Sequence, residues 1–143
     1  MRVEESIEID RPVEEVFAYV ANPQNLLEWS GLVIEVKDVR VPLSEGDTFT
    51  TVGKFLGRRF ETPFERISIE PNRRYTDRAK GGPVPNQDWT YTFEEVPAGT
   101  RLTRAVEGEP GGFFKLADPL IERALKRQVR ADLETIKDLL VAQ

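Results

Sequence analysis

Arg104 is the residue of this chain whose position most clearly suggests chemistry. It lies between Leu102 and Val106, so a strand over residues 100–108 would point the guanidinium toward the apolar face. A buried guanidinium is unfavourable unless it is paired or faces a polar ligand. Three interpretations stay open: an anchor for the carboxylate, phenolate or carbonyl of a ligand, a structural ion pair, or a bulge that turns the side chain outward.

Asp77 is the second polar candidate. It lies between Tyr75 and Ala79, on the expected inner face of a strand over residues 73–80. An inward carboxylate could pair with Arg104 at the floor of a pocket and orient a ligand, or it could serve as a base. The register between these strands is not given by the sequence, and residue type alone favours a solvent-exposed Asp77 at a sheet edge.

Aromatic residues alternate along a strand expected over residues 87–96. Trp89, Tyr91 and Phe93 share one face, which in a solid protein is core and in a hollow one is the wall of a pocket. The hydroxyl of Tyr91 needs a hydrogen-bond partner when it is buried, so Tyr91 is the better candidate for a polar ligand contact.

Trp29 and Tyr19 precede the strand series and are candidates for the mouth of such a pocket. Trp29 ends an expected short helix over residues 24–29, where it could equally anchor that helix by packing. We therefore expect a ligand-binding set made of Arg104, Tyr91, Trp89, Asp77, Trp29 and Tyr19.

The amino-acid composition excludes several kinds of catalytic site. The chain has no histidine and no cysteine, which excludes Ser-His and Cys-His nucleophiles and the commonest transition-metal ligands. No phosphate loop, dinucleotide fingerprint or calcium loop is present, and no cluster of carboxylates suggests a metal site. We expect neither a cofactor nor a metal ion.

The length and charge of the chain narrow its class further. Its 143 residues suit a single domain over residues 1–143, large enough to enclose a pocket. A net charge of −5 is unfavourable for general nucleic-acid binding. No apolar run approaches the roughly 20 residues that span a bilayer, and the charged N-terminus lacks a signal sequence. We expect a cytoplasmic protein without integral membrane association.

The elements that must position these residues follow from the periodicity. A strand over residues 3–9 precedes two short helices, one beginning at Asp10-Arg11-Pro12 and one over residues 24–29. Further strands are predicted over residues 32–41 with a bulge near Lys37-Asp38, 48–56, 59–69, 73–80, 87–96 and 100–108.

The C-terminal segment Phe113–Ala142 is predicted to be one long helix, about 45 Å at 1.5 Å per residue. Its apolar stripe consists of Ala117, Ile121, Leu125, Val129, Leu133, Ile136 and Leu140. The opposite, solvent-facing side is predicted to carry Glu122, Arg123, Lys126, Arg127, Arg130, Asp132, Glu134 and Lys137. Only this helix is long enough to cover the apolar face of the sheet, and a cavity remains if the sheet curls around it loosely.

The stretch IDRPVEEVFAYVANPQNLLEW, residues 9–29, resembles the opening of the polyketide cyclase/dehydrase and lipid-transport group of the SRPBCC, or START-like, superfamily. The matching features are Pro12, Val16-Phe17, the break at Asn22-Pro23-Gln24-Asn25, Trp29, and a closing helix with LETIKDLL at residues 133–140. The resemblance implies an α+β helix-grip fold, in which a curved antiparallel sheet of about seven strands wraps around the long helix.

The resemblance also implies a pocket for an apolar ligand, but its members range from carriers to aromatase/cyclases and share no catalytic motif that could be transferred to this chain. The primary hypothesis is therefore binding of a small hydrophobic or aromatic molecule in an interior cavity. The alternative is a cyclase- or dehydratase-like enzyme in which Arg104, Asp77 or Tyr91 assists proton transfer. A third class, an interaction module that uses its outer surface, would apply if the interior were solid.

Overall fold

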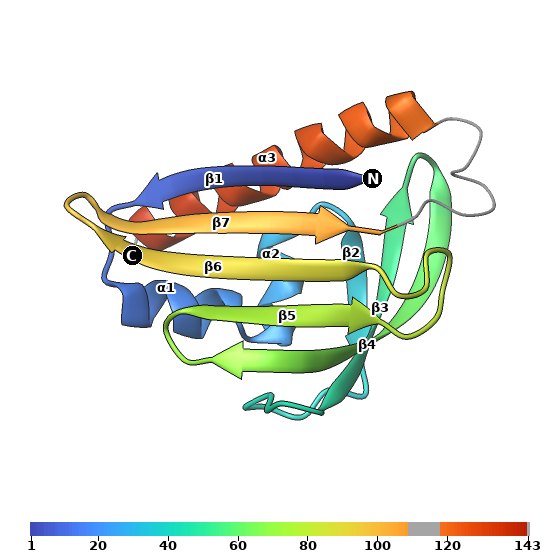
Figure 1. Ribbon diagram of the computed structural model, residues 1–143, viewed down its shortest axis with the longest axis horizontal. Coiled ribbons are helices and arrows are strands. Elements are labelled where there is room, and N and C mark those ends of the chain that lie inside the picture. Colours follow the sequence, from blue (N-terminus) through green and yellow to red (C-terminus); the bar gives the residue numbers. More distant parts are fainter. Residues whose placement is uncertain (109–117, 143) are drawn as a thin grey trace.

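A seven-stranded antiparallel sheet curls around the C-terminal helix in the computed structural model, which describes residues 1–108 and 118–142 (Figure 1). The strand order across the sheet is β1-β7-β6-β5-β4-β3-β2. The strands are β1 (Arg2–Ile9), β2 (Val33–Lys37), β3 (Thr48–Phe55), β4 (Arg58–Glu70), β5 (Arg74–Ala79), β6 (Asp88–Val96) and β7 (Gly99–Glu107). This arrangement confirms the predicted α+β helix-grip fold.

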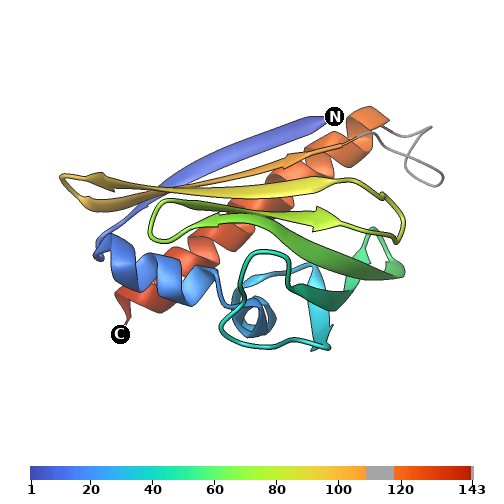
Figure 2. The same cartoon turned by 60° about the horizontal axis from the view of Figure 1, so that its bottom comes forward.

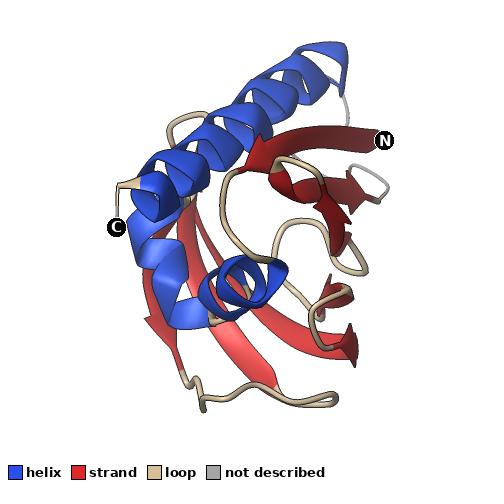
Figure 3. Ribbon diagram, turned by 90° about the vertical axis from the view of Figure 1, so that its left-hand side faces the viewer, coloured by secondary structure: helices blue, strands red, loops and turns tan. Residues whose placement is uncertain are grey.

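Three short helical segments connect the two edges of the sheet, β1 and β2. The first is α1 (Val13–Val20), which follows Pro12 and buries Val13, Val16 and Val20. The 3-10 helix η1 (Pro23–Asn25) begins where the side chain of Asn22 accepts a hydrogen bond from the backbone N–H of Gln24 at 3.0 Å. It leads directly into α2 (Leu26–Trp29). Figure 3 shows these segments on the same side of the curved sheet as the long helix.

The long helix α3 (Asp118–Val141) crosses the inner face of the sheet obliquely, as Figure 2 shows. Six of its predicted stripe residues are buried: Ile121, Leu125, Val129, Leu133, Ile136 and Leu140. Ile121 packs with Val84 in a separate cluster, and the other five pack with residues of β1 and β7 such as Val3, Leu102 and Val106. The predicted first turn at residues 113–117, with Ala117, lies outside the described residues. None of the described helices has the length and apolarity that crossing a membrane would require.

Three details of the sequence prediction are wrong. The strand predicted over residues 32–41 ends at Lys37, because Asp38 adopts a positive φ of 55° that turns the chain out of the sheet. The bulge is not near Lys37-Asp38 but at the other end of β2, between Val33 and Glu35. Asp132 does not face solvent but is 2% exposed, on the side of α3 that packs against the sheet.

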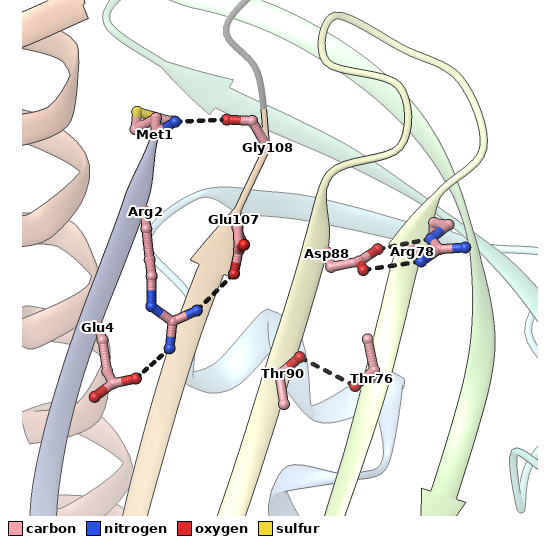
Figure 4. Close-up of polar contacts among 9 residues, drawn as sticks. All are labelled: Met1, Arg2, Glu4, Thr76, Arg78, Asp88, Thr90, Glu107 and Gly108. Carbon is pink, nitrogen blue, oxygen red and sulfur yellow. Dashed lines mark hydrogen bonds and ion pairs between the residues drawn. The ribbon is translucent and has the colours of Figure 1, made fainter.

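Alternation along the central strands decides which side chains reach the interior. In β5 and β6, Arg78 forms an ion pair with Asp88 at 2.8 Å, and the hydroxyls of Thr76 and Thr90 lie 3.0 Å apart (Figure 4). These contacts lie on the face of the sheet that is turned away from α3. The intervening residues of β5, among them Asp77, therefore point toward the helix.

Gly99, in the turn between β6 and β7, supplies a first prediction. Its φ is 133°, and a Cβ there would collide with the carbonyl oxygen of Ile9 and lie 2.9 Å from the backbone nitrogen of Arg11. Gly57 also has a positive φ, 77°, but open space surrounds the position of its Cβ. Gly57→Ala should cost roughly 1 kcal/mol, the cost of a left-handed conformation alone. Gly99→Ala should cost clearly more, because backbone atoms cannot move aside.

Urea unfolding of both variants measures the two costs. Equal losses of stability would contradict the close approach of the β6–β7 turn to the end of β1.

Candidate functional site

A cavity of about 160 Å³ lies between the inner face of the sheet and helices α2 and α3, and it is partly open to solvent. Most of its lining is apolar, including Phe49, Phe55, Phe60, Phe64, Val84 and Leu125. An apolar cavity of about 150 Å³ is large enough for a benzene-sized molecule. Four residues of the predicted set line this cavity: Arg104, Tyr91, Trp89 and Asp77.

Arg104 points inward from β7, as its parity predicts, and is 3% exposed. Its Nε donates a hydrogen bond to the hydroxyl oxygen of Tyr91 at 3.1 Å, and its Nη1 donates to Oδ2 of Asp132 at 3.1 Å. Its Nη2 has no hydrogen bond to any described residue. Arg104 is therefore part of a structural ion pair and also keeps one donor group available at the cavity.

Asp132 is the partner of Arg104, and sequence reasoning missed it. Its Oδ1 accepts hydrogen bonds from the backbone N–H of Gly31 at 2.9 Å and from Nε2 of Gln128 at 2.8 Å. A Cβ at position 31 would collide with the side chain of Gln128, so this close approach favours glycine. The sequence contained one indication that Asp132 is buried. It lies three residues after Val129 and four before Ile136, which places it on the buried stripe of the helix.

Asp77 is buried and does not pair with Arg104, so the predicted pairing and the expected exposure are both wrong. Its two carboxylate oxygens accept hydrogen bonds from Nε and Nη2 of Arg66 at 2.8 and 3.1 Å. Nη1 of Arg66 donates to the carbonyl of Ala21 at 2.9 Å, which holds the end of α1. The physical reason is register: β4 lies next to β5, with Arg66 opposite Asp77. Arg66 was missed, although it shares the parity of Phe64, which also lines the cavity.

Burial and charge act against one another on the pKa values of these groups. Burial works to lower the pKa of both arginines, but Asp77 raises that of Arg66, and Tyr91 and Asp132 raise that of Arg104. Burial raises the pKa of Asp77, and the hydrogen bonds from Arg66 oppose that rise. Both arginines therefore remain charged inside the protein.

Aromatic rings separate and cover the two charged pairs. The rings of Tyr75 and Tyr91 stack with centroids 4.4 Å apart. The guanidinium carbon of Arg66 lies 4.0 Å from the Tyr75 centroid, and that of Arg104 lies 4.5 Å from the Trp89 centroid. Such cation–π contacts stabilise a guanidinium that water cannot reach. These aromatic and charged side chains form the floor of the cavity: Arg66, Asp77, Tyr75, Trp89, Tyr91 and Arg104. The walls above this floor are apolar.

Trp29 and Tyr19 are not among the residues that line the cavity. Trp29 is 2% exposed and packs edge-on against Tyr91, with the guanidinium of Arg104 5.0 Å from its ring centroid. The hydroxyl of Tyr19 donates to a carboxylate oxygen of Glu28 at 2.7 Å on the protein surface. Trp29 thus supports the floor from behind, which is the packing alternative that the sequence left open.

Metal-binding groups do not gather at this site. Within residues 1–108 and 118–142, no three acidic side chains lie close enough together to hold a metal ion. Besides the donors and paired charges described above, the polar residues that line the cavity are Ser30, Thr51, Lys54, Thr62 and Gln87.

The profile of the family described as "Polyketide cyclase / dehydrase and lipid transport" matches residues 1–141. The chain belongs to this family. Its fold is shared by the crystal structure of TTHA0849 from Thermus thermophilus, with a TM-score of 0.83 at 18% identity over 99% of this chain and 98% of that one. Protein MLL2253 from Mesorhizobium loti is also similar, with a TM-score of 0.74 at 18% identity over 100% of this chain and 98% of that one.

Among curated sequences, the uncharacterized protein Rv0088 of Mycobacterium tuberculosis is 27% identical over 117 residues. The match covers 80% of this chain and 50% of that protein. The chain therefore spans about half the length of the curated relatives it matches.

The buried pair between Arg104 and Asp132 supplies a second prediction. Asp132→Leu leaves a guanidinium buried without its counter-ion and should reduce the free energy of unfolding by roughly 3–5 kcal/mol. The double variant Arg104→Leu/Asp132→Leu removes both charges and should recover most of that loss. Asp138→Leu, on the exposed side of the same helix, is the matched control and should have little effect. A double variant no more stable than Asp132→Leu in urea unfolding would contradict the pairing.

The tyrosines supply a third prediction. Burial raises the pKa of Tyr75, Tyr91 and, together with its hydrogen bond to Glu28, Tyr19. Above about pH 10 the unfolded chain loses tyrosine protons that the folded chain keeps. Stability should then fall with rising pH, by up to about 1.4 kcal/mol per pH unit for each of the buried Tyr75 and Tyr91, and by less for the surface residue Tyr19.

Urea unfolding at a series of alkaline pH values measures that slope, and ultraviolet absorbance follows tyrosinate. More than one equivalent of tyrosinate near pH 10 while the protein stays folded, as judged by circular dichroism, would contradict the assigned burial of Tyr75 and Tyr91.

Proposed function

We propose that this protein binds a small hydrophobic or aromatic molecule in its interior cavity and acts as a carrier or sensor of that molecule. The observation that carries the proposal is the apolar cavity of about 160 Å³ with Arg104 and Tyr91 at its floor. Solid packing is the rule inside proteins, and voids of this size are few. A hollow with apolar walls and a small number of polar groups is the usual form of a ligand site.

The shape and chemistry of the floor favour a ligand with a flat ring. Tyr75, Tyr91 and Trp89 all line the cavity, and aromatic faces stack well on planar molecules. The free N–H groups of Arg104 would hold a polar substituent of that ring. Trp89 is itself fixed, because its indole N–H donates to Oε1 of Gln87 at 3.0 Å. We expect the ligand to adapt to this floor rather than the floor to the ligand.

Binding is better supported than catalysis. In a cyclase- or dehydratase-like reaction a cavity group would have to take a proton from the substrate. Each carboxylate oxygen of Asp77 already accepts a hydrogen bond from Arg66. Burial raises the pKa of the Tyr91 phenol, which makes its deprotonated form scarce at neutral pH. Neither residue is poised as a base.

The experiment uses acetophenone as a probe and isothermal titration calorimetry as the measurement. Thr51 lines the cavity from β3, whereas Thr50 does not. Thr51→Phe should fill the cavity and weaken binding at least about tenfold, about 1.4 kcal/mol. Thr50→Phe is the matched control and should leave the affinity unchanged. Native mass spectrometry of the purified protein would also detect a retained ligand.

Absence of binding by the parent protein, or equal binding by the two phenylalanine variants, would overturn the proposal. In the first case the cavity is not a site for aromatic molecules of this size, and in the second the probe binds elsewhere.

A further inference from the structure

We propose that Asp132 makes the cavity select an uncharged ligand with a carbonyl-type acceptor over a carboxylate of the same shape. The preferred class is a planar aromatic ketone, aldehyde, ester or quinone. This inference rests on the function proposed above and specifies the chemistry of the molecule that enters.

The charges around the cavity floor are balanced before any ligand arrives. Arg66 and Asp77 neutralise one another within the lining, and Arg104 is neutralised by Asp132 from behind. Lys54 also borders the cavity, but it is exposed, so water and salt screen its charge. Among the side chains of the described residues, the lining therefore presents no unpaired buried cation to an entering anion.

A carboxylate ligand would be an additional, uncompensated negative charge at this floor. Transfer of an ion from water into an apolar site costs several kcal/mol unless a counter-ion is present. Arg104 cannot serve fully as that counter-ion, because Asp132 already lies 3.1 Å from its Nη1. A neutral carbonyl carries no such cost.

Two hydrogen-bonding groups at the floor are free to donate. Nη2 of Arg104 has no hydrogen bond to a described residue. The hydroxyl of Tyr91 accepts a hydrogen bond from Nε of Arg104 and donates its own hydrogen to no described acceptor. Both oxygens of Asp77 face Arg66, and the hydroxyls of Ser30, Thr51 and Thr62 elsewhere in the lining can donate as well as accept. A carbonyl oxygen has two lone pairs and can accept from both free donors.

Asp132 is held firmly enough to keep this preference. The N–H of Gly31 and the amide of Gln128 fix its Oδ1, while Oδ2 faces Arg104. The carboxylate cannot swing away to release Arg104 to an anion without breaking these contacts. Asp132 does not itself line the cavity, so it acts as a specificity-determining residue through Arg104.

Three probes of nearly equal shape test the proposal at neutral pH: acetophenone, benzoate and the hydrocarbon α-methylstyrene. Calorimetry on the unmodified protein should show the ketone binding at least about tenfold more tightly than either of the others. The difference in affinity between the ketone and the hydrocarbon measures the contribution of the two donors. The difference between the ketone and the carboxylate measures the effect of the charge balance.

A variant then tests the role of Asp132 itself. Asp132→Asn removes the negative charge and keeps a side chain of the same size, so benzoate should gain at least about tenfold in affinity relative to the ketone. Asp138→Asn, on the exposed side of the same helix, should leave the preference unchanged. The comparison of probes on the unmodified protein decides the question even if Asp132→Asn does not fold.

The outcomes separate the two proposals. Carboxylate binding as tight as that of the ketone overturns this inference and leaves the binding function intact. Equal affinities for the ketone and the hydrocarbon also overturn it, because the donors would then be without effect. Binding of none of the three probes overturns both proposals. An Asp132→Asn variant that folds and keeps the original preference removes Asp132 as its cause.

Discussion

The ion pair between Arg104 and Asp132 joins the last strand of the sheet to the helix that the sheet encloses. Both side chains are at most 3% exposed, so each depends on the other for compensation of its charge. The pair fixes the rotation of α3 and its position along β7, because a charge cannot be left in an apolar interior. The aromatic floor and the hollow above it follow from that fixed distance between sheet and helix.

A second buried ion pair, between Arg66 and Asp77, fixes the position of the short helices, as the first pair fixes that of α3. The guanidinium of Arg66 also holds the carbonyl of Ala21, and the hydroxyl of Tyr75 holds that of Val20 at 3.2 Å. The end of α1 is therefore tied to the middle of the sheet by polar contacts as well as by the apolar packing of Val16 and Val20. In this way the protein keeps a void where side chains would otherwise converge.

Period-two and period-3.6 patterns were sufficient to predict the order of strands and helices, the inward direction of Arg104 and the shared face of Trp89 and Tyr91. They could not give the partners of Arg104 and Asp77, because those depend on strand register and on the rotation of α3. Asp132 illustrates the limit. A single carboxylate among charged neighbours is assigned to solvent by residue type, although its spacing places it on the buried stripe, and Arg104 across the interface compensates its charge there.

The pairing of β1 with β7 brings the two ends of the sequence together. Val3 lies opposite Val106 and Ile9 opposite Thr100, whereas every other neighbouring pair of strands is consecutive in the chain. Contacts so distant in sequence carry a large loop-closure entropy and are associated with slow folding. During synthesis β1 stays unpaired until nearly the whole sheet has left the ribosome. The cavity can therefore close only at a late stage of co-translational folding.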